Sequence, residues 1–337
     1  MHLGVAGVIL KREVMEIALM RKLGDSGIQV PGLCFGGNVF GWTADEQRSF
    51  ELLDALLESG LNFVDTADSY SHWAPGNHGG ESETIIGRWF KARGNRGKVI
   101  LATKVGSPMG AGKKGLSRHY IRQAVEDSLR RLQTDYIDLY QSHRDDDGVA
   151  QVETLGAYAE LIEAGKVRAI GASNFTAERL LSALEVSREY NLPRYESLQP
   201  EYNLYDRAGY ESALEGVCVE HGLGVIPYFS LASGFLSGKY RSAEEAASRP
   251  RAGMLKKYFN ERGMRILDTL ANVARELNAK PAQVALAWLM ARPSITAPIA
   301  SATTVEQLQE LVAAMRLELP SKMVEALNQA GAEKVAA

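Results

Sequence analysis

Cysteine is scarce in this sequence of 337 residues, in which only Cys34 and Cys218 occur. Both stand among apolar residues, which favours buried free thiols in a reducing compartment over a disulfide. No apolar run approaches the ~20 residues that span a bilayer, so we expect no membrane partner. The chain also lacks a strong charge imbalance, since its formal net charge is -3 and its pI about 6.1. Composition therefore gives no electrostatic reason to expect nucleic acid as a partner.

The first residues lack the pattern of a secretory signal. A short apolar stretch covers residues 4–10, but no basic region precedes it and no A-x-A cleavage site follows. We therefore expect a cytoplasmic protein. Met15 offers an alternative natural start. Residues 1–14 would then be an upstream extension outside the fold, and residues 15–337 a single domain.

Apolar runs of strand length alternate with helical patterns along the chain. Most of these runs are continuous, as is typical of parallel strands that are covered on both faces. The expected strands are residues 30–35, 61–65, 99–104, 136–141, 167–171, 197–199, 224–227 and 295–299.

Helix signals lie between these runs. Ser117 can cap a helix with one apolar face, formed by Ile121, Val125, Leu129 and Leu132. Thr43 or Asp45 can open an earlier helix that Gly60 ends, and Pro281 opens a later one.

Eight strand–helix pairs in one series predict an α/β fold, the (β/α)8 TIM barrel. An open doubly wound sheet is the alternative, but the early glycines do not form the G-x-G-x-x-G pattern that its first turn should carry. Residues 237–261, after the seventh strand, are polar and basic and too long for an ordinary connection. They predict a lid over the barrel mouth, and a further helix is expected at the C-terminus.

Four reactive side chains follow the second, third and fourth expected strands: Asp65, Tyr70, Lys104 and His143. Each alone has an ordinary structural explanation, as a cap, a packing residue, an ion-pair partner or a hydrogen-bonded histidine. Together they favour one site, because the C-terminal ends of barrel strands face a common mouth.

These residue types suit proton transfer to a carbonyl oxygen. A phenol near pKa 10 is a weak acid, and a nearby ammonium such as Lys104 would lower the pKa of Tyr70. Asp65 could keep the lysine charged and oriented, and His143 could fix the substrate oxygen. The set would polarise a carbonyl and protonate the alkoxide that forms when hydride arrives at carbon.

Five segments together resemble the ordered signatures of the aldo-keto reductase family: residues 63–70, 102–104, 140–143, 171–175 and 199–203. The similarity runs from about residue 15 to the C-terminus. It implies a (β/α)8 barrel that uses NAD(P)H to reduce aldehydes and ketones, or catalyses the reverse reaction. It also implies that Tyr70 is the general acid, that Lys104 and Asp65 tune it, and that His143 orients the carbonyl.

The same resemblance implies a cofactor site. Side chains after the fifth and sixth strands would hold the nicotinamide carboxamide, the aromatic ring of Tyr228 would stack on the nicotinamide, and residues 228–240 would cover the pyrophosphate. Phe229 and Ser230 depart from the Ser-Pro of many relatives. The expected cofactor residues are Gly37, Asn38, Ser173, Asn174, Gln199, Tyr228, Ser230, Leu231, Gly234, Lys239, Ser301, Thr303, Gln307 and Glu310.

The choice of cofactor depends on the C-terminal motif at residues 299–311. Many relatives have Arg or Lys where Thr303 stands and Asn where Leu311 stands. A 2′-phosphate needs a cation, which Lys239 or Arg241 could supply instead. We therefore expect NADP(H), with NAD(H) as the alternative.

Loops around the four residues should select the substrate. Trp73, Trp42 and Arg144 are the expected contacts, and they suit a small carbonyl compound or a sugar-type substrate. His72 and His78 could suggest a metal, but no carboxylate or thiol stands at ligand spacing, so none is expected.

Two other functions remain open from the sequence. A Schiff-base lyase would use Lys104 as its nucleophile. A non-catalytic regulatory subunit would sense the redox state of the nicotinamide. The sequence favours no particular oligomeric state.

Overall fold

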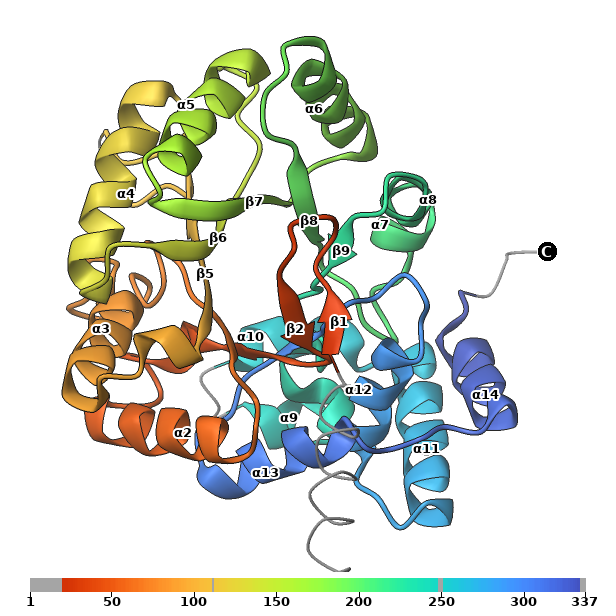
Figure 1. Ribbon diagram of the computed structural model, residues 1–337. Coiled ribbons are helices and arrows are strands. Elements are labelled where there is room, and N and C mark those ends of the chain that lie inside the picture. The colour runs from red at the N-terminus through yellow and green to blue at the C-terminus, as the bar shows by residue number, and fades with distance from the viewer. Residues whose placement is uncertain (1–19, 111, 248–250, 334–337) are drawn as a thin grey trace, which may run out of the picture.

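The computed structural model describes residues 20–110, 112–247 and 251–333. In this part of the chain, eight parallel strands curl into one sheet in the order β10-β3-β4-β5-β6-β7-β8-β9 (Figure 1). They are β3 (Cys34–Gly36), β4 (Phe63–Asp65), β5 (Ile100–Val105), β6 (Ile137–Ser142), β7 (Val167–Ser173), β8 (Tyr195–Gln199), β9 (Gly224–Val225) and β10 (Ile299–Ala300). The backbone N–H of Thr296 donates to the carbonyl of Val225 at 2.8 Å, which joins the two edges. The (β/α)8 barrel that the sequence predicts is confirmed.

Helices surround the sheet in the order that the sequence suggests (Figure 1). Asp45, rather than Thr43, caps the first of them by accepting the backbone N–H of Arg48 at 2.8 Å. Ser117 and Pro281 open their helices as expected. The long helices are α2 (Glu46–Glu58), α3 (Glu81–Arg93), α4 (Arg118–Leu132), α5 (Gln151–Glu163), α6 (Ala177–Glu189), α11 (Glu261–Glu276), α12 (Pro281–Met290), α13 (Val305–Ala314) and α14 (Ser321–Gly331), with the shorter α7 (Ala208–Glu211) and α8 (Leu214–Glu220).

The first expected strand, residues 30–35, is divided in the structure. Its first half belongs to β2 (Gln29–Pro31), which pairs antiparallel with β1 (Met20–Lys22), and only its second half enters the barrel as β3. Leu23, Ile28 and Val30 of this hairpin pack against apolar side chains inside the barrel. The division therefore has a physical cause, because the apolar N-terminal end of the barrel needs a cover from water.

Strand alternation sets a polar layer above this apolar interior. The lower inward positions are held by Cys34, Phe63, Ala102, Leu139, Ala169 and Ile226. Side chains two residues apart on a strand share a face. Asp65, Lys104 and Gln141 follow Phe63, Ala102 and Leu139 by two residues each, so all three point into the barrel at its C-terminal end.

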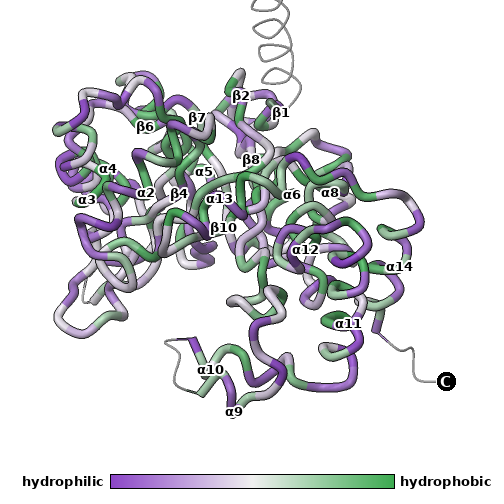
Figure 2. Tube along the Cα trace, turned by 90° about the horizontal axis from the view of Figure 1, so that it is seen from below, coloured by the Kyte–Doolittle hydropathy of each residue, from purple (hydrophilic) through white to green (hydrophobic). Residues whose placement is uncertain are grey.

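The segment expected to form a lid, residues 237–261, is largely helical. After the 3-10 turn η3 (Ala232–Ser237) it contains α9 (Ala243–Ala246), α10 (Ala252–Leu255) and η4 (Lys256–Tyr258). Buried Leu255 and Tyr258 anchor it. Figure 2 shows α9 and α10 at the end of the molecule opposite the β1–β2 hairpin. The lid therefore lies at the C-terminal mouth of the barrel.

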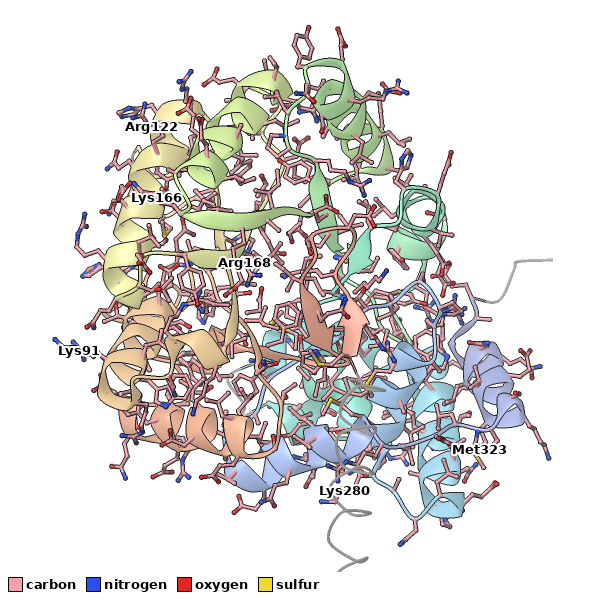
Figure 3. The ribbon with its side chains drawn as sticks, in the orientation of Figure 1. Lys91, Arg122, Lys166, Arg168, Lys280 and Met323 are labelled. Atoms are coloured by element: carbon pink, nitrogen blue, oxygen red, sulfur yellow. The ribbon has the colours of Figure 1, made fainter. Side chains whose placement is uncertain are left out.

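Charged side chains lie on the outer faces of the helices (Figure 3). Lys91, Arg122 and Lys280 extend outward from the ring of helices in Figure 3. In the ranges described here, no helix is both long enough and apolar enough to cross a membrane.

Candidate functional site

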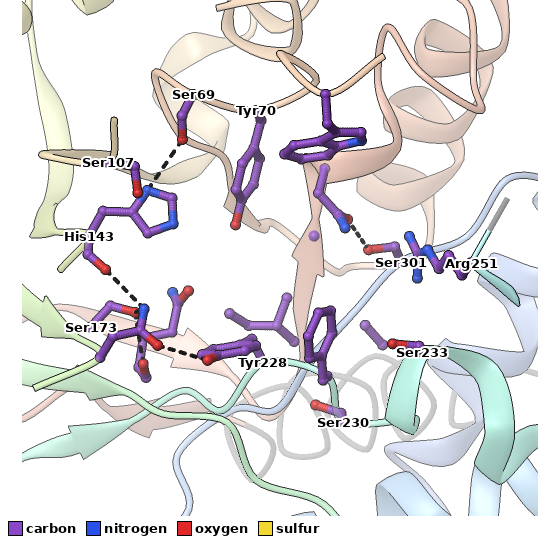
Figure 4. Close-up of a pocket in the computed structure, with 18 of the residues that line it drawn as sticks. Ser69, Tyr70, Ser107, His143, Ser173, Tyr228, Ser230, Ser233, Arg251 and Ser301 are labelled. Atoms are coloured by element: carbon purple, nitrogen blue, oxygen red, sulfur yellow. Dashed lines mark hydrogen bonds between the residues drawn. The ribbon is translucent and has the colours of Figure 1, made fainter. Parts of the chain in front are cut away.

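A cavity of about 790 Å³ opens at the C-terminal ends of the strands (Figure 4). Its wall is formed by strand ends, by the loops after β4, β5, β6 and β9, and by Arg251 of the lid, just before α10. Two of the four predicted reactive residues form part of this wall, and the other two are buried beneath it. Tyr70 and His143 line it directly, whereas Lys104 is buried behind Tyr70. Asp65 is also fully buried and lies deeper in the barrel.

The carboxylate of Asp65 is the centre of a buried hydrogen-bond network. Its Oδ2 accepts from Lys104 Nζ at 2.6 Å and from the Tyr70 hydroxyl at 3.1 Å. Its Oδ1 accepts from Gln141 Nε2 at 3.1 Å and from Gln199 Nε2 at 3.0 Å. Four donors thus converge on one buried carboxyl group and fix its orientation.

Lys104 uses its three N–H groups on three different acceptors. They are Asp65 Oδ2, the carbonyl of Thr66 at 2.7 Å and the Tyr70 oxygen at 2.8 Å. Burial lowers the pKa of Lys104, and the charge of Asp65 opposes this. Three short contacts to acceptors suit an ammonium, because a neutral amine would turn its lone pair toward one of them.

The pKa of Tyr70 differs from the sequence-based expectation. Burial raises it well above its ordinary value, and the negative charge of Asp65 raises it further. Lys104 does not reverse this, because its own charge is compensated by the same carboxylate. Tyr70 therefore holds its proton firmly in this state. The ammonium 2.8 Å away is placed to stabilise the phenolate once that proton has left.

His143 sits across the cavity from Tyr70, with 6.0 Å between the two ring centroids. Burial lowers its pKa well below the usual value, and the charge of Lys104 lowers it further, so the ring is neutral at pH 7. Ser69 Oγ lies 3.4 Å from its Nδ1. If Ser69 donates there, the ring hydrogen stays on Nε2, which Figure 4 shows facing the space beside Tyr70.

The residues expected at the nicotinamide carboxamide are brought together. Ser173, Asn174, Gln199 and Tyr228 all line the cavity. The Tyr228 hydroxyl donates to Asn174 Oδ1 at 2.7 Å, and Asn174 Nδ2 donates to the carbonyl of His143 at 2.9 Å. Gln199 instead directs its Nε2 to Asp65. Gln199 thus joins the cavity wall to the buried carboxyl group of Asp65.

The loop after β9 has an unusual backbone. Phe229, Ala232 and Ser233 have φ values of 53°, 49° and 58°, in the left-handed region, and Gly234 has φ of 103°. No atom lies within 4 Å of the position that a Gly234 side chain would take. The bare backbone at this point leaves room for a phosphate group to approach closely.

Other expected cofactor residues have different places. Asn38 and Ser301 line the cavity and hydrogen-bond to each other at 2.7 Å, and Ser230, Leu231 and Gly234 also line it. The remaining five lie outside its wall. Gly37 is buried behind it, Lys239 is exposed, Thr303 hydrogen-bonds to Gln307, and Glu310 pairs with Lys280.

Arg251 is a cavity residue that the sequence did not single out. It belongs to the lid, just before α10, and its guanidinium carbon lies 5.3 Å from the ring centroid of Trp42. Figure 4 shows it beside Ser301. The basic composition of the lid was the available signal, but nothing in the sequence distinguished Arg251 from the neighbouring basic residues.

The expected substrate contacts gather at the mouth. Trp73 is 43% exposed and makes edge contacts with Trp42 and Tyr70, at centroid distances of 5.6 and 6.0 Å. Trp73 and Arg144 line the cavity, whereas Trp42 is not part of its wall and contacts Trp73. The aromatic pair forms one apolar side of the opening.

A second buried carboxyl, Asp68, lies near the site without a partner. Neither of its oxygens accepts a hydrogen bond from any described residue, and its side chain is almost fully buried. Burial raises its pKa well above the usual value, and the charge of Glu83 adds to the effect. Glu83 itself is paired with Arg131.

Cysteine and metal-ligand residues can also be placed. Cys34 and Cys218 are buried free thiols, as the sequence predicted. Within the described residues, no three His, Cys, Asp or Glu side chains gather so as to hold a metal ion.

The cavity suits a nicotinamide dinucleotide in its chemistry. No described residue of its wall carries a carboxylate, while Arg144 and Arg251 are cationic. Such a wall accepts a polyanion without like-charge repulsion. Amide and hydroxyl groups at one end match a carboxamide, and the bare backbone at Gly234 matches a pyrophosphate.

Comparison with known proteins agrees with these features. Residues 32–332 match the sequence model of the Aldo/keto reductase family. The uncharacterized oxidoreductase YrpG of Bacillus subtilis (strain 168) is 36% identical over 314 residues, which cover 91% of this chain and 94% of the relative. A probable voltage-gated potassium channel subunit beta of Oryza sativa subsp. japonica is 32% identical over 305 residues, covering 88% and 90%. The L-glyceraldehyde 3-phosphate reductase of Escherichia coli (strain K12) is 30% identical over 306 residues, covering 88% and 87%.

Proposed function

Because this chain belongs to the aldo/keto reductase family, we propose that it reduces an aldehyde or ketone to an alcohol with a nicotinamide cofactor, or catalyses the reverse reaction. The observation that carries the proposal is the buried chain Asp65–Lys104–Tyr70, with contacts of 2.6 and 2.8 Å, ending at the cavity. A phenol that is kept protonated and backed by an ammonium is a proton donor for an alkoxide.

The bound reduced cofactor would supply hydride to the carbonyl carbon. As negative charge develops on the carbonyl oxygen, Tyr70 gives its proton to that oxygen. The phenolate left behind is stabilised by Lys104 Nζ, and Asp65 keeps that ammonium in place. Tyr70 then takes up a proton from solvent through the open mouth. In total, one hydride and one proton are added to the carbonyl group.

His143 orients the reacting carbonyl in this proposal. A neutral imidazole with its hydrogen on Nε2 can donate to the carbonyl oxygen without competing for the proton of Tyr70. Its lowered pKa supports this role, since an imidazolium would add a second cation beside Lys104.

Replacement of the phenol tests the assignment. Tyr70→Phe should still quench its fluorescence on binding reduced cofactor, while kcat for aldehyde reduction falls by about 10²–10⁴-fold. Phe90→Leu, away from the cavity, serves as a control for core disturbance. Turnover retained in Tyr70→Phe would remove Tyr70 from the proposed mechanism.

The two alternative functions have less support. A Schiff-base lyase needs a free amine, but Lys104 is fully buried and donates to three acceptors. Borohydride trapping of a carbonyl compound on Lys104 would favour it. A regulatory role has the name of the Oryza sativa relative in its favour. Tight cofactor binding without turnover on any carbonyl compound would support that role.

We propose NADP(H) as the preferred cofactor, with NAD(H) second. The sequence lacks a cation at Thr303, but the fold supplies Arg251 at the cavity near Ser301. Arg251→Gln should weaken NADPH more than NADH, and Lys239→Ala measures the contribution of the exposed lysine. Equal affinity of the unaltered protein for the two reduced cofactors would overturn the preference.

The substrate is proposed to be a small carbonyl compound or an aldehyde of sugar type. The Trp42–Trp73 pair offers an apolar wall, and serines and His72 offer hydrogen bonds on the other sides. Two buried free thiols support a reducing, cytoplasmic location. A panel of aldehydes, ketones and sugars with both reduced cofactors would narrow the class.

A further inference from the structure

The cavity wall is positively charged at two separate places. Figure 4 shows Arg251 beside Ser301, on the side proposed for the cofactor. Arg144 follows the catalytic-side residue His143 directly in the sequence and also lines the cavity. No carboxylate of a described residue shares this wall with them. Arg144 is thus a cation close to the reacting carbonyl and separate from the place proposed for the cofactor phosphates.

Three acidic residues follow Arg144 in the sequence, but at least two of them are bound elsewhere. Asp145 accepts two hydrogen bonds from Arg179, at 2.6 Å from Nε and 3.0 Å from Nη2. Asp146 accepts the backbone N–H groups of Leu116 and Gly148, at 2.8 and 3.2 Å. These two carboxylates therefore stabilise the loop and do not pair with Arg144.

Arg144 itself forms no ion pair or hydrogen bond within the residues described. Its side chain is exposed at the mouth, where it can turn toward a ligand. Its charge is felt inside the cavity. Burial and the charge of Lys104 lower the pKa of His143, and Arg144 lowers it further. Burial raises the pKa of Tyr228 to about 12, and Arg144 opposes this rise. A guanidinium in this position offers a paired set of donors that matches a carboxylate or a phosphate.

We infer that the substrate carries an anionic group, a carboxylate or a phosphate, which pairs with Arg144 while its carbonyl group lies between Tyr70 and His143. This inference rests on the proposed carbonyl reduction and adds the charge class of the substrate. Arg144 acts here on specificity and takes no part in proton transfer. Its contribution should appear in the selection between anionic and neutral aldehydes.

The test compares aldehydes that differ only in charge. One pair is 4-oxobutanoate and its methyl ester, and the other is glyceraldehyde 3-phosphate and glyceraldehyde. The unaltered protein should prefer the anionic member of at least one pair by about tenfold in kcat/KM, as a charge-assisted pair at a partly exposed site allows. The pair that shows the preference identifies carboxylate or phosphate. Because the pair is partly exposed, the preference should shrink as salt is added.

Variants separate a charge contact from a structural effect. Arg144→Gln should reduce the preference at least fivefold, because kcat/KM falls more for the anionic member than for the neutral member, while Arg144→Lys should restore part of it. Arg122→Gln removes a positive charge from the outer face of α4 and should change neither value.

Each outcome decides between the proposals. Reduction of the neutral aldehydes without any anion preference would overturn this inference and leave the proposed function intact. An equal loss on both members in Arg144→Gln would also overturn it, because the arginine would then be structural. Absence of reduction across all four compounds and the wider carbonyl panel would overturn the proposed function, and this inference with it.

Discussion

Gln141 Nε2 donates to Asp65 Oδ1 at 3.1 Å, on the carboxylate oxygen that neither Lys104 nor Tyr70 uses. Gln199 donates to the same oxygen at 3.0 Å and to Gln141 Oε1 at 3.2 Å, so the two amides brace each other. Gly171 makes room for this arrangement, because a side chain there would meet Gln141 Cγ at 3.1 Å and Ser197 Oγ at 2.3 Å. Gln141 is therefore a positioning residue for Asp65.

Loss of this donor should slow proton transfer without weakening cofactor binding. In Gln141→Leu the carboxylate loses one of its four hydrogen bonds and can rotate away from Lys104. We expect kcat for aldehyde reduction to fall by about tenfold, which corresponds to about 1.4 kcal/mol, close to the net contribution of one hydrogen bond. The Kd of reduced cofactor, measured by fluorescence quenching, should stay within twofold.

A matched control is Gln123→Leu, since Gln123 is exposed on α4. Gln141→Glu offers a second reading, because a carboxylate beside Asp65 adds like-charge repulsion and should alter the pH profile of kcat as well as its size. Unchanged kcat in both Gln141 variants would show that Gln199 alone holds Asp65.

The pH dependence of reduction follows from two pKa shifts. The pKa of Tyr70 is raised, so the proton donor stays protonated up to alkaline pH, and the pKa of His143 is lowered, so the imidazole stays neutral down to acidic pH. We expect kcat/KM for the reduction of a neutral aldehyde to vary less than twofold between pH 6 and 9. A titration within this window that disappears in His143→Gln would contradict the assigned neutral state.

The sequence predicted the barrel and its reactive residues because both follow from local patterns. Continuous apolar runs identified the barrel strands. Asp65, Lys104 and His143 stand at or next to the C-terminal ends of three of these strands. Gln141 was missed even though strand alternation places it on the same face as Leu139. The side-chain amide of Gln141 carries no titratable group that would mark it in the sequence. Its positioning role follows from its hydrogen bond to Asp65, which is 76 residues away along the chain.

Features that depend on long-range packing could not be predicted in this way. The β1–β2 hairpin is stabilised by packing against the apolar interior of the barrel. No local pattern in residues 20–31 indicates this contact. Arg251 reaches the cavity because the lid folds back over the mouth. The upward shift of the Tyr70 pKa comes from burial first and then from the charge of Asp65, and both depend on how the folded chain packs around the phenol.

Arg21 ties the hairpin to the barrel by hydrogen bonds, in addition to the apolar contacts of Leu23, Ile28 and Val30. Arg21 donates to three backbone carbonyls, those of Ile295, Thr296 and Met290, at 3.0, 3.2 and 3.0 Å. Met290 ends α12, where the helix dipole favours a cation. Arg21→Ala should therefore lower the free energy of unfolding by about 2 kcal/mol in denaturant titrations. Lys22→Ala, on the same strand but exposed, should change it by less than about 0.5 kcal/mol.

Asp68 lowers the stability of the folded protein, whereas Arg21 raises it. Its raised pKa means that the folded protein keeps a proton which the unfolded chain releases above about pH 4. Since the folded state then binds more protons, stability falls as pH rises from that value toward the pKa of the folded state. Asp68→Asn removes the titrating group and keeps its shape. The variant should be more stable than the unaltered protein at pH 8, by about 1 kcal/mol or more.

The pH dependence of this gain separates charge from packing. The advantage of Asp68→Asn should grow between pH 5 and pH 8, because only the unaltered protein carries the unfavourable proton linkage. Asp147→Asn removes an exposed carboxyl and should show no such trend. Denaturant midpoints at the two pH values measure both variants. A gain of equal size at pH 5 and pH 8 would mean that the amide forms new hydrogen bonds in the buried site. A loss at both would mean that the carboxyl has a partner that the amide cannot replace.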